Sequence, residues 1–563
     1  MKKCGILLIF VLSIIVNVYF GYQKAGFHED EYYTYYSSNR SVGLYQPDRE
    51  WQDRQTILDE FVVKNGEGFN YGLVALVQSW DVHPPFYYMI FHTICSLFPG
   101  VFTKWTGIIT NLIAFSLTFL VLDLILKRLR VSFLMEMLGL LFYGFNPQTI
   151  SGNMLTRMYA WLSFFVALCA YLHIRLVQDY KSMKTLNVSE HKETQKVSFV
   201  GALKEYGMYI LPVAVTSYLG FLTQYFYLFF FVSIGIAYTA WIVFLNKNIR
   251  YGITYVISCA VSLGLAVISY PASLHHMLGG YRGNEAAGSL FDIGNTLMRL
   301  SFFAGLLNDF VFAGLLWMII GTIIVLAIIG IIKYAKDNTI TDESYDNGYG
   351  KRALTADFVM LIIGTIGYFL ITTKTALLVG AASNRYEMPA YGLVIIILAV
   401  TIHRLGVIWH IGDTDGDAEK KHSQKGASTI IGIALCCITV VTLYKGLLID
   451  NRVLFIYAED REKIAFASER HDKVAVVMFN PATPHNVWRL TDELLEYDKV
   501  YYMNEENNDP LDDVEIMNAG EIILYAADDD NQENAINNLM QYASLNEREK
   551  IYTEEMWNTY ILR

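Results

Sequence analysis

The chain places its densest early group of carboxylates directly after its first apolar run. Glu29, Asp30 and Glu31 lie within ten residues of the run ILLIFVLSIIVNVYFGY, and His28 precedes them. A carboxylate in this position can take a proton from an attacking hydroxyl, or the three acids can simply solvate the end of a helix. Adjacent acids at a membrane boundary favour a functional site. Glu29 is the acid that best fits plain surface.

A second polar group ends the long loop after this first run. Asp81 and His83 stand before Pro84 and Pro85 in the sequence DVHPP. Two prolines restrict the backbone and end any preceding helix. They can therefore hold the His83 side chain rigidly, in a position to donate a hydrogen bond to a bound substrate. The prolines can equally begin an interfacial helix at its first turn. We expect Asp81 and His83 to bind substrate.

Four cations lie near the ends of later apolar runs: Arg157, Arg282, Lys374 and Arg385. Arginine binds phosphate in a two-pronged geometry, so we expect these cations to bind a phosphorylated substrate. Two alternatives stay open, because Lys374 can extend toward the membrane surface and Arg157 can pair with an acid.

The aromatic residues and histidines are less informative. Most of the 39 tyrosines suit the interfacial belts of a membrane protein, and only Tyr159 and Tyr386 are expected to line the site. The histidines lack the HxxxH spacing of a metal site. The sequence therefore predicts no cofactor and no metal, with a divalent metal ion as the less favoured alternative.

The elements that must position these residues are membrane helices. The chain is 54% hydrophobic and only 17% charged, which is typical of a polytopic membrane protein. The run 84–98 opens with two prolines and suits an interfacial segment better than a span. Eleven other stretches are long enough to cross: 4–21, 106–126, 133–149, 158–177, 207–221, 224–245, 252–270, 309–332, 355–373, 387–405 and 427–446.

Basic loops set the expected orientation. If 84–98 does not cross, every basic loop falls on the same side as Lys2 and Lys3, which the positive-inside rule assigns to the cytoplasm. The N-terminus is then cytoplasmic and the C-terminal part is extracytoplasmic, in a multi-pass protein of the cell membrane. The acids, DVHPP and the four cations all meet at the outer face.

The C-terminal part differs in character from the rest. Residues 451–563 hold 24 acids and 10 bases, and an acidic tail argues against nucleic acid as a partner. Strands at 473–479, 499–503 and 521–527, with a helix at 487–497, predict a small parallel α/β unit. We divide the chain into a membrane domain, 1–446, with an outer loop at 22–105, and an extracytoplasmic domain, 447–563.

Taken together, these motifs resemble the GT-C superfamily of membrane glycosyltransferases. An Asp-Glu pair after the first span, HPPFYY at 83–88, RMYA at 157–160 and RYEMP at 385–389 are similar to the branch of protein O-mannosyltransferases and lipid A aminoarabinose transferases, which is glycosyltransferase family 39-like. The resemblance covers residues 1–410. The chain departs from the family at Gln224, where a histidine is common, and in having three adjacent acids.

The resemblance implies a hexosyl- or pentosyltransferase that takes a sugar from a polyprenyl-phosphate donor with inversion. The acceptor, a lipid, a cell-wall polymer or a protein, would be met at the outer leaflet of the bilayer. Asp30 aligns with the first acid of the family's pair and is the expected base, Glu31 would orient it, and Arg385 would stabilise the departing phosphate.

Two other classes of protein stay open. One is a lipid-linked saccharide flippase or transporter, and the other is an assembly protein whose outer loops bind partners. Transporters often show internal repeats and mid-membrane charges, whereas this chain shows no repeat and gathers its charges at one surface. This difference favours the enzyme.

Overall fold

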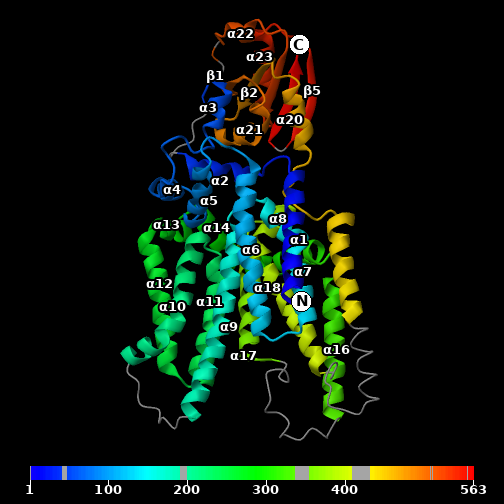
Figure 1. The fold of residues 1–563 in the computed structure, drawn as a ribbon. Coiled ribbons are helices and arrows are strands. Elements are labelled where there is room, and N and C mark those ends of the chain that lie inside the picture. Colours follow the sequence, from blue (N-terminus) through cyan, green and yellow to red (C-terminus); the bar gives the residue numbers. More distant parts are fainter. Residues whose placement is uncertain are drawn as a thin grey trace.

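The computed structural model describes residues 2–40, 47–189, 199–336, 354–408, 432–507, 509, 511–554 and 556–563. A bundle of long apolar helices carries a six-stranded sheet at one end, which we call the sheet end (Figure 1). This arrangement confirms the expected fold class, an α-helical polytopic membrane protein with a small C-terminal α/β unit.

Within the described residues, nine helices are long and apolar enough to cross a membrane. They correspond to nine of the eleven expected spans. The helices are α1 (Lys2–Gln23), α6 (Lys104–Arg128), α9 (Tyr159–Ser189), α10 (Phe199–Thr223), α11 (Tyr227–Ala240) with the π-helical turn Trp241–Leu245, α12 (Ile249–Ser269), α17 (Ala356–Thr375), α18 (Asn384–Ile408) and a last span, Gly432–Ile449.

The expected span at 133–149 is not a single long helix, and the one at 309–332 is a helix of 21 residues that begins later than expected. The first divides into α7 (Phe133–Gly144) and α8 (Pro147–Met154), because Asn146 precedes a proline and caps the second helix through its side chain. The second begins only at α16 (Leu316–Lys336), because the backbone at Ala313 and Gly314 is left-handed. Both predictions therefore overlooked a break.

The stretch between α12 and α16 is also more helical than expected. It contains α13 (Ala272–Leu278), α14 (Tyr281–Phe291) and α15 (Thr296–Leu306), followed by a π-helical turn, Leu307–Val311. The helical segments Tyr281–Phe291 and Ile293–Val311 are bent by 75° and, by length and composition, could be one broken span or a re-entrant loop. By the same measure the described residues hold nine spans, or up to ten if this bent pair is one span.

The outer loop folds at the sheet end. It contains α2 (Glu29–Asn39), β1 (Glu50–Asp53), α3 (Arg54–Leu58), α4 (Tyr71–Gln78) and α5 (Phe86–Leu97). The helix α5 has 12 residues, which is too short for a span and agrees with the interfacial segment expected at 84–98.

The C-terminal unit is a mixed sheet in the order β1-β3-β2-β4-β6-β5. The three predicted strands form its parallel centre, β2 (Val474–Phe479), β3 (Lys499–Asn504) and β4 (Ile522–Ala527), and β6 (Trp557–Leu562) and β5 (Arg548–Glu554) extend it antiparallel. Its helical segments are α20 (Asp460–Ser468), the 3₁₀ helix η7 (Pro484–Leu490), α21 (Thr491–Leu494), α22 (Val514–Met517) and α23 (Gln532–Tyr542). The helix expected at 487–497 is thus a 3₁₀ turn and a short α-helix.

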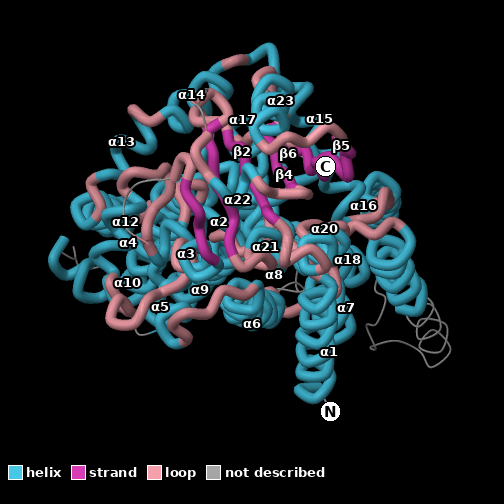
Figure 2. Tube along the Cα trace, turned by 90° about the horizontal axis from the view of Figure 1, so that it is seen from above, coloured by secondary structure: helices cyan, strands magenta, loops and turns pink. Residues whose placement is uncertain are grey.

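The sheet is joined to the outer loop in two ways. Strand β1 of the loop pairs antiparallel with β3, so the loop supplies one edge of the sheet. The second contact is between η7 and α2, where Tyr33 and Tyr36 pack on Trp488 with ring centroids 5.1 and 4.5 Å apart. The sheet therefore sits over the outer loop at the end of the bundle (Figure 2).

Candidate active site

The three acids form the first turn of α2. His28 caps this helix, since its side-chain Nδ1 accepts a hydrogen bond from the backbone N–H of Asp30. The backbone N–H of His28 donates to Glu31 Oε2 at 2.8 Å. Burial lowers the pKa of His28 to about 3, although Asp30 acts to raise it. A neutral imidazole can accept the hydrogen bond from the Asp30 N–H. The three carboxylates of the first turn are favoured by the positive end of the helix dipole.

Asp30 lies between two arginines that are distant in sequence. Arg385 Nη1, from the start of α18, is 2.5 Å from Asp30 Oδ2. Arg157 Nη2, from the turn before α9, is 3.9 Å from Asp30 Oδ1, and its Nη1 donates to the Asp30 carbonyl at 3.2 Å. The Asp30 side chain is 24% exposed, whereas those of Arg157 and Arg385 are 4% and 8% exposed. One partly accessible carboxylate thus faces two buried guanidinium groups.

The electrostatics of Asp30 follow from this geometry. Burial alone would raise the pKa of the Asp30 carboxyl, but the charges of Arg157 and Arg385 outweigh it and hold that pKa well below its usual range. Both arginines also keep a buried Nε that makes no hydrogen bond. The site therefore holds an ionised carboxylate and two guanidinium groups with hydrogen-bonding capacity to spare.

Asp81 and His83 join the same cluster. His83 Nδ1 is 3.0 Å from Asp81 Oδ2, and its Nε2 is 3.3 Å from Arg157 Nη2. Because the guanidinium group can only donate, His83 Nε2 accepts and Nδ1–H donates to Asp81. The expected grouping of Asp81 and His83 with the acids and Arg157 is thus present in the structure.

Glu31 occupies a different environment from Asp30. Its side chain is fully buried and accepts hydrogen bonds from Lys24 Nζ, the His28 N–H and the Thr156 N–H, at 2.9, 2.8 and 2.7 Å. A carboxylate with three donors and no exposure is suited to hold its neighbours in place rather than to meet a substrate.

Two aromatic residues expected to line the site lie beside Arg385. Arg385 Nη2 donates to the hydroxyl of Tyr386 at 3.3 Å, and its guanidinium group lies 5.2 Å from that ring. The Tyr159 ring meets the Tyr386 ring edge to face at 5.8 Å. Gln224, at the position where the family departs, is buried at the turn before α11.

The other two expected cations have local partners instead. Arg282 forms an exposed ion pair with Glu285 of its own helix at 3.0 Å. Lys374 Nζ donates to the Asp292 carbonyl, to Asn295 Oδ1 and to Thr296 Oγ1, so it ties the end of α17 to the start of α15. Of the four cations, the structure brings only Arg157 and Arg385 to Asp30.

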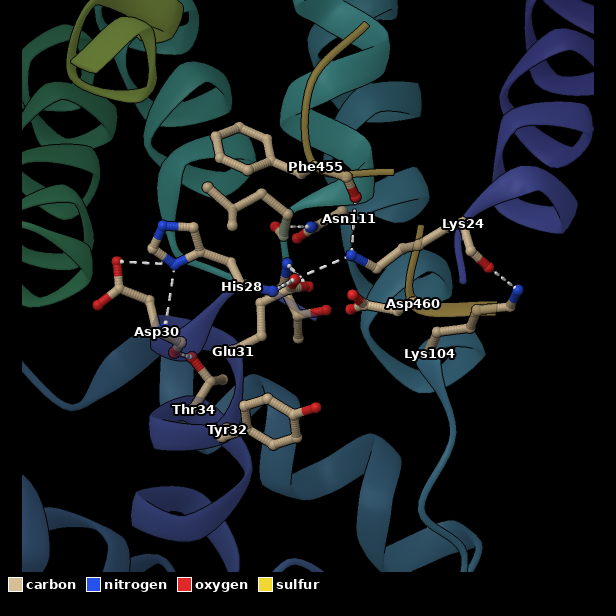
Figure 3. A network of polar contacts seen from close by, with 12 residues as sticks. Lys24, His28, Asp30, Glu31, Tyr32, Thr34, Lys104, Asn111, Phe455 and Asp460 are labelled. Atoms are coloured by element: carbon tan, nitrogen blue, oxygen red, sulfur yellow. Dashed lines mark hydrogen bonds and ion pairs between the residues drawn. The ribbon is translucent and has the colours of Figure 1, made fainter. Parts of the chain in front are cut away.

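The structure adds two residues that the sequence did not single out. Lys24 is fully buried and pairs with Glu31. Asn111, from α6, donates to the Leu155 carbonyl at 2.6 Å and so helps to fix the turn that carries Arg157 (Figure 3). A polar residue inside an apolar run is a sequence signal that could have indicated Asn111.

The described residues contain no group of three or more histidine, cysteine, aspartate or glutamate side chains that could hold a metal ion. The absence of a bound metal ion stays a prediction from the sequence.

Comparison with known proteins gives few matches. No family model matches the sequence, and no curated protein matches it. Two solved structures of ArnT from Cupriavidus metallidurans are similar to the chain, one bound to undecaprenyl phosphate and one in the apo state. Each is 10% identical with a TM-score of 0.47, over 99% and 100% of this chain and 97% and 98% of the other.

Proposed function

We propose that the protein is a membrane glycosyltransferase of the GT-C type that transfers a sugar from a polyprenyl-phosphate donor to an acceptor hydroxyl, with inversion. The observation that carries this proposal is the position of Asp30 between Arg157 and Arg385 at one end of an apolar helical bundle. A base and two phosphate-binding groups at the end of membrane spans match a donor whose phosphate lies at the lipid boundary.

The proposed reaction is a single displacement. The acceptor oxygen forms a bond to the anomeric carbon as the bond from that carbon to the phosphate oxygen breaks, and the acceptor proton passes to the Asp30 carboxylate. The polyprenyl phosphate leaves as a dianion, and Arg157 and Arg385 stabilise the charge that develops on it. His83, held by Asp81, lies beside Arg157 and is placed to contact the phosphate or the acceptor.

The ion pairs also suggest how the donor activates the base. While Arg157 and Arg385 face Asp30, its pKa is held low and the carboxylate is a weak base. A donor phosphate that binds the two guanidinium groups would neutralise part of their charge, and the pKa of Asp30 would then rise toward its ordinary value. The base would thus become effective when the donor is bound.

The proposal is tested by changing the acids one at a time. Asp30→Asn keeps the size of the side chain and removes the base, so transfer should fall by about 100-fold or more with normal membrane insertion, as expected for a lost general base. Glu29→Gln is the matched control, since Glu29 is exposed on the same helical turn, and it should stay within about threefold of the wild type. The assay follows label from polyprenyl-phosphate hexoses and pentoses into lipid, polymer and protein fractions.

Two results would contradict the proposal. If Asp30→Asn retains near-normal transfer, then Asp30 is not the base. If reconstituted protein moves a lipid-linked saccharide across the bilayer and no label reaches any acceptor, then the flippase alternative holds.

A further inference from the structure

Lys24 is buried at the sheet end, directly after α1. Its Nζ donates to Glu31 Oε2 and to the Phe455 carbonyl, each at 2.9 Å, and neither side chain of the Lys24–Glu31 pair is exposed (Figure 3). The rings of Phe27 and Tyr457 lie 5.4 and 5.5 Å from the ammonium group. A buried ammonium ion is costly unless it is paired and hydrogen-bonded. The fold must therefore keep Glu31 and the Phe455 carbonyl within reach of Lys24.

The partner of Lys24 connects the two segments that form the candidate active site. Glu31 Oε2 accepts the N–H of His28, which caps the helix that carries Asp30. Glu31 Oε1 accepts the N–H of Thr156, the residue before Arg157. One carboxylate therefore sets the position of Asp30 relative to Arg157.

The turn that carries Arg157 has little freedom to adjust on its own. Gly107 of α6 lies so close to Thr156 that a Cβ on that glycine would collide with the Thr156 side chain. Asn111, also from α6, holds the Leu155 carbonyl. Because the Thr156 end of the hydrogen bond to Glu31 is fixed in this way, a shift of the Glu31 carboxylate moves the first turn of α2, which also carries Asp30.

The second acceptor of Lys24 comes from the C-terminal part of the chain. Phe455 lies in the segment between the last span and α20, and its ring meets that of His28 at 5.8 Å. Gly26, two residues after Lys24, packs against Asp460 at the start of α20, where a Cβ would collide. The ammonium group of Lys24 thus has both of its hydrogen-bond acceptors only when this C-terminal segment lies against the end of α1.

We propose that Lys24 is a positioning residue for the transfer reaction: through Glu31 it holds Asp30 in register with Arg157, and its bond to the Phe455 carbonyl makes this register depend on the seating of the C-terminal unit. This inference rests on the proposed function, because it assigns a role in placing the proposed base. It gives the C-terminal unit a part in the active site that requires no catalytic residue of its own.

The test compares full-length variants in detergent, with the polyprenyl-phosphate sugar that the wild type uses as donor. Lys24→Met removes the charge at similar length, and we expect kcat to fall at least about tenfold while the donor KM changes less than about threefold, since small displacements of a reacting group lower kcat strongly. Lys64→Met is the matched control, because Lys64 forms a partly exposed pair with Asp59 in the same loop, and it should behave as the wild type.

A double variant separates positioning from simple charge balance. Lys24→Met leaves Glu31 buried without a counter-charge and should lower the melting temperature. Lys24→Met combined with Glu31→Gln removes both charges, so the melting temperature should recover, but kcat should stay low because the neutral amide is a poorer acceptor for two N–H groups.

Two outcomes would overturn the inference. One is a Lys24→Met variant with kcat within about threefold of the wild type, and the other is a double variant that recovers kcat together with its melting temperature. If Lys24→Met does not insert, the double variant alone decides between these outcomes. A wild-type protein that transfers no sugar would instead contradict the proposed function, and the melting temperatures would still report the pair.

Discussion

At the scale of single residues, the contact between Asp30 and Arg385 leads to a pH-dependent prediction. Arg385 helps to hold the pKa of Asp30 low. In the free wild-type protein Asp30 should therefore stay ionised as the pH falls to about 3.9, the ordinary pKa of an aspartate side chain. In Arg385→Gln the pKa rises, and the residual kcat/KM should fall on acidification at a higher pH than in the wild type. Profiles of kcat/KM between about pH 4 and pH 8 test this shift.

The control for this prediction is Lys374→Gln. Lys374 was expected in the site from the sequence, but it binds Asp292, Asn295 and Thr296. Its removal should leave the shape of the pH profile unchanged. An Arg385→Gln profile that coincides with the wild type would contradict the role of Arg385 in lowering the pKa of Asp30.

Residue chemistry predicted the grouping of some members of this cluster and missed others. The sequence motifs at the span ends contain unusual polar side chains, and the structure brings four of these together: Asp30, His83, Arg157 and Arg385. Arg282 looked equivalent, but Glu285 lies one helical turn away and pairs with it. Lys24 was not predicted, because in sequence a buried lysine at a span end is indistinguishable from one that extends to the membrane surface.

At the scale of elements, α2 has two faces with separate tasks. Its first turn carries the acids, while Tyr33 and Tyr36 pack on Trp488 of η7 and the hydroxyl of Tyr32 donates to Asp492 at 3.2 Å. Tyr32, Tyr33 and Tyr36 therefore form a docking surface for the C-terminal unit. Composition could not reveal this, because tyrosines are equally common in interfacial belts.

The docked segment leads to a prediction about stability. Burial raises the pKa of Asp492 to about 7 and that of Glu493 to about 8. The folded state therefore holds protons that the unfolded state, with carboxyl pKa values of about 4, releases. The stability that these groups contribute is full below about pH 4 and is lost as the pH rises through about 7 to 8.

Limited proteolysis of the full-length protein measures this effect. Cleavage within 447–563 should be faster at about pH 8.5 than at about pH 6. Asp492→Asn together with Glu493→Gln should remove most of the difference, because neither replacement ionises. Equal cleavage rates in the wild type at the two pH values would contradict the prediction.

At the scale of the whole molecule, the division between membrane and outer parts is less sharp than the sequence suggested. A boundary at residue 447 is natural from composition, yet β1 of the outer loop pairs with β3 of the C-terminal sheet. A strand of four residues in a long loop gives almost no periodic signal. The apolar spans were easier to predict, because their length is set by bilayer thickness, and two of the predicted runs are interrupted, at Asn146 and at Ala313-Gly314.

Orientation is the remaining prediction at this scale. The basic loops predict that the sheet end lies outside the cell, and the positive-inside rule makes this testable with single cysteines in a protein whose six native cysteines are replaced. Lys247→Cys lies in the basic turn between α11 and α12, and Asp512→Cys lies in the sheet unit, and both native side chains are exposed. A membrane-impermeant maleimide added to intact cells should label the Asp512→Cys variant and not the Lys247→Cys variant, and permeabilised cells should show both. Labelling of both variants in intact cells would contradict the predicted number of crossings between the two positions. Labelling of Lys247→Cys alone would reverse the orientation and would place the Asp30 cluster on the cytoplasmic side, where a donor with its sugar in the outer leaflet could not reach it.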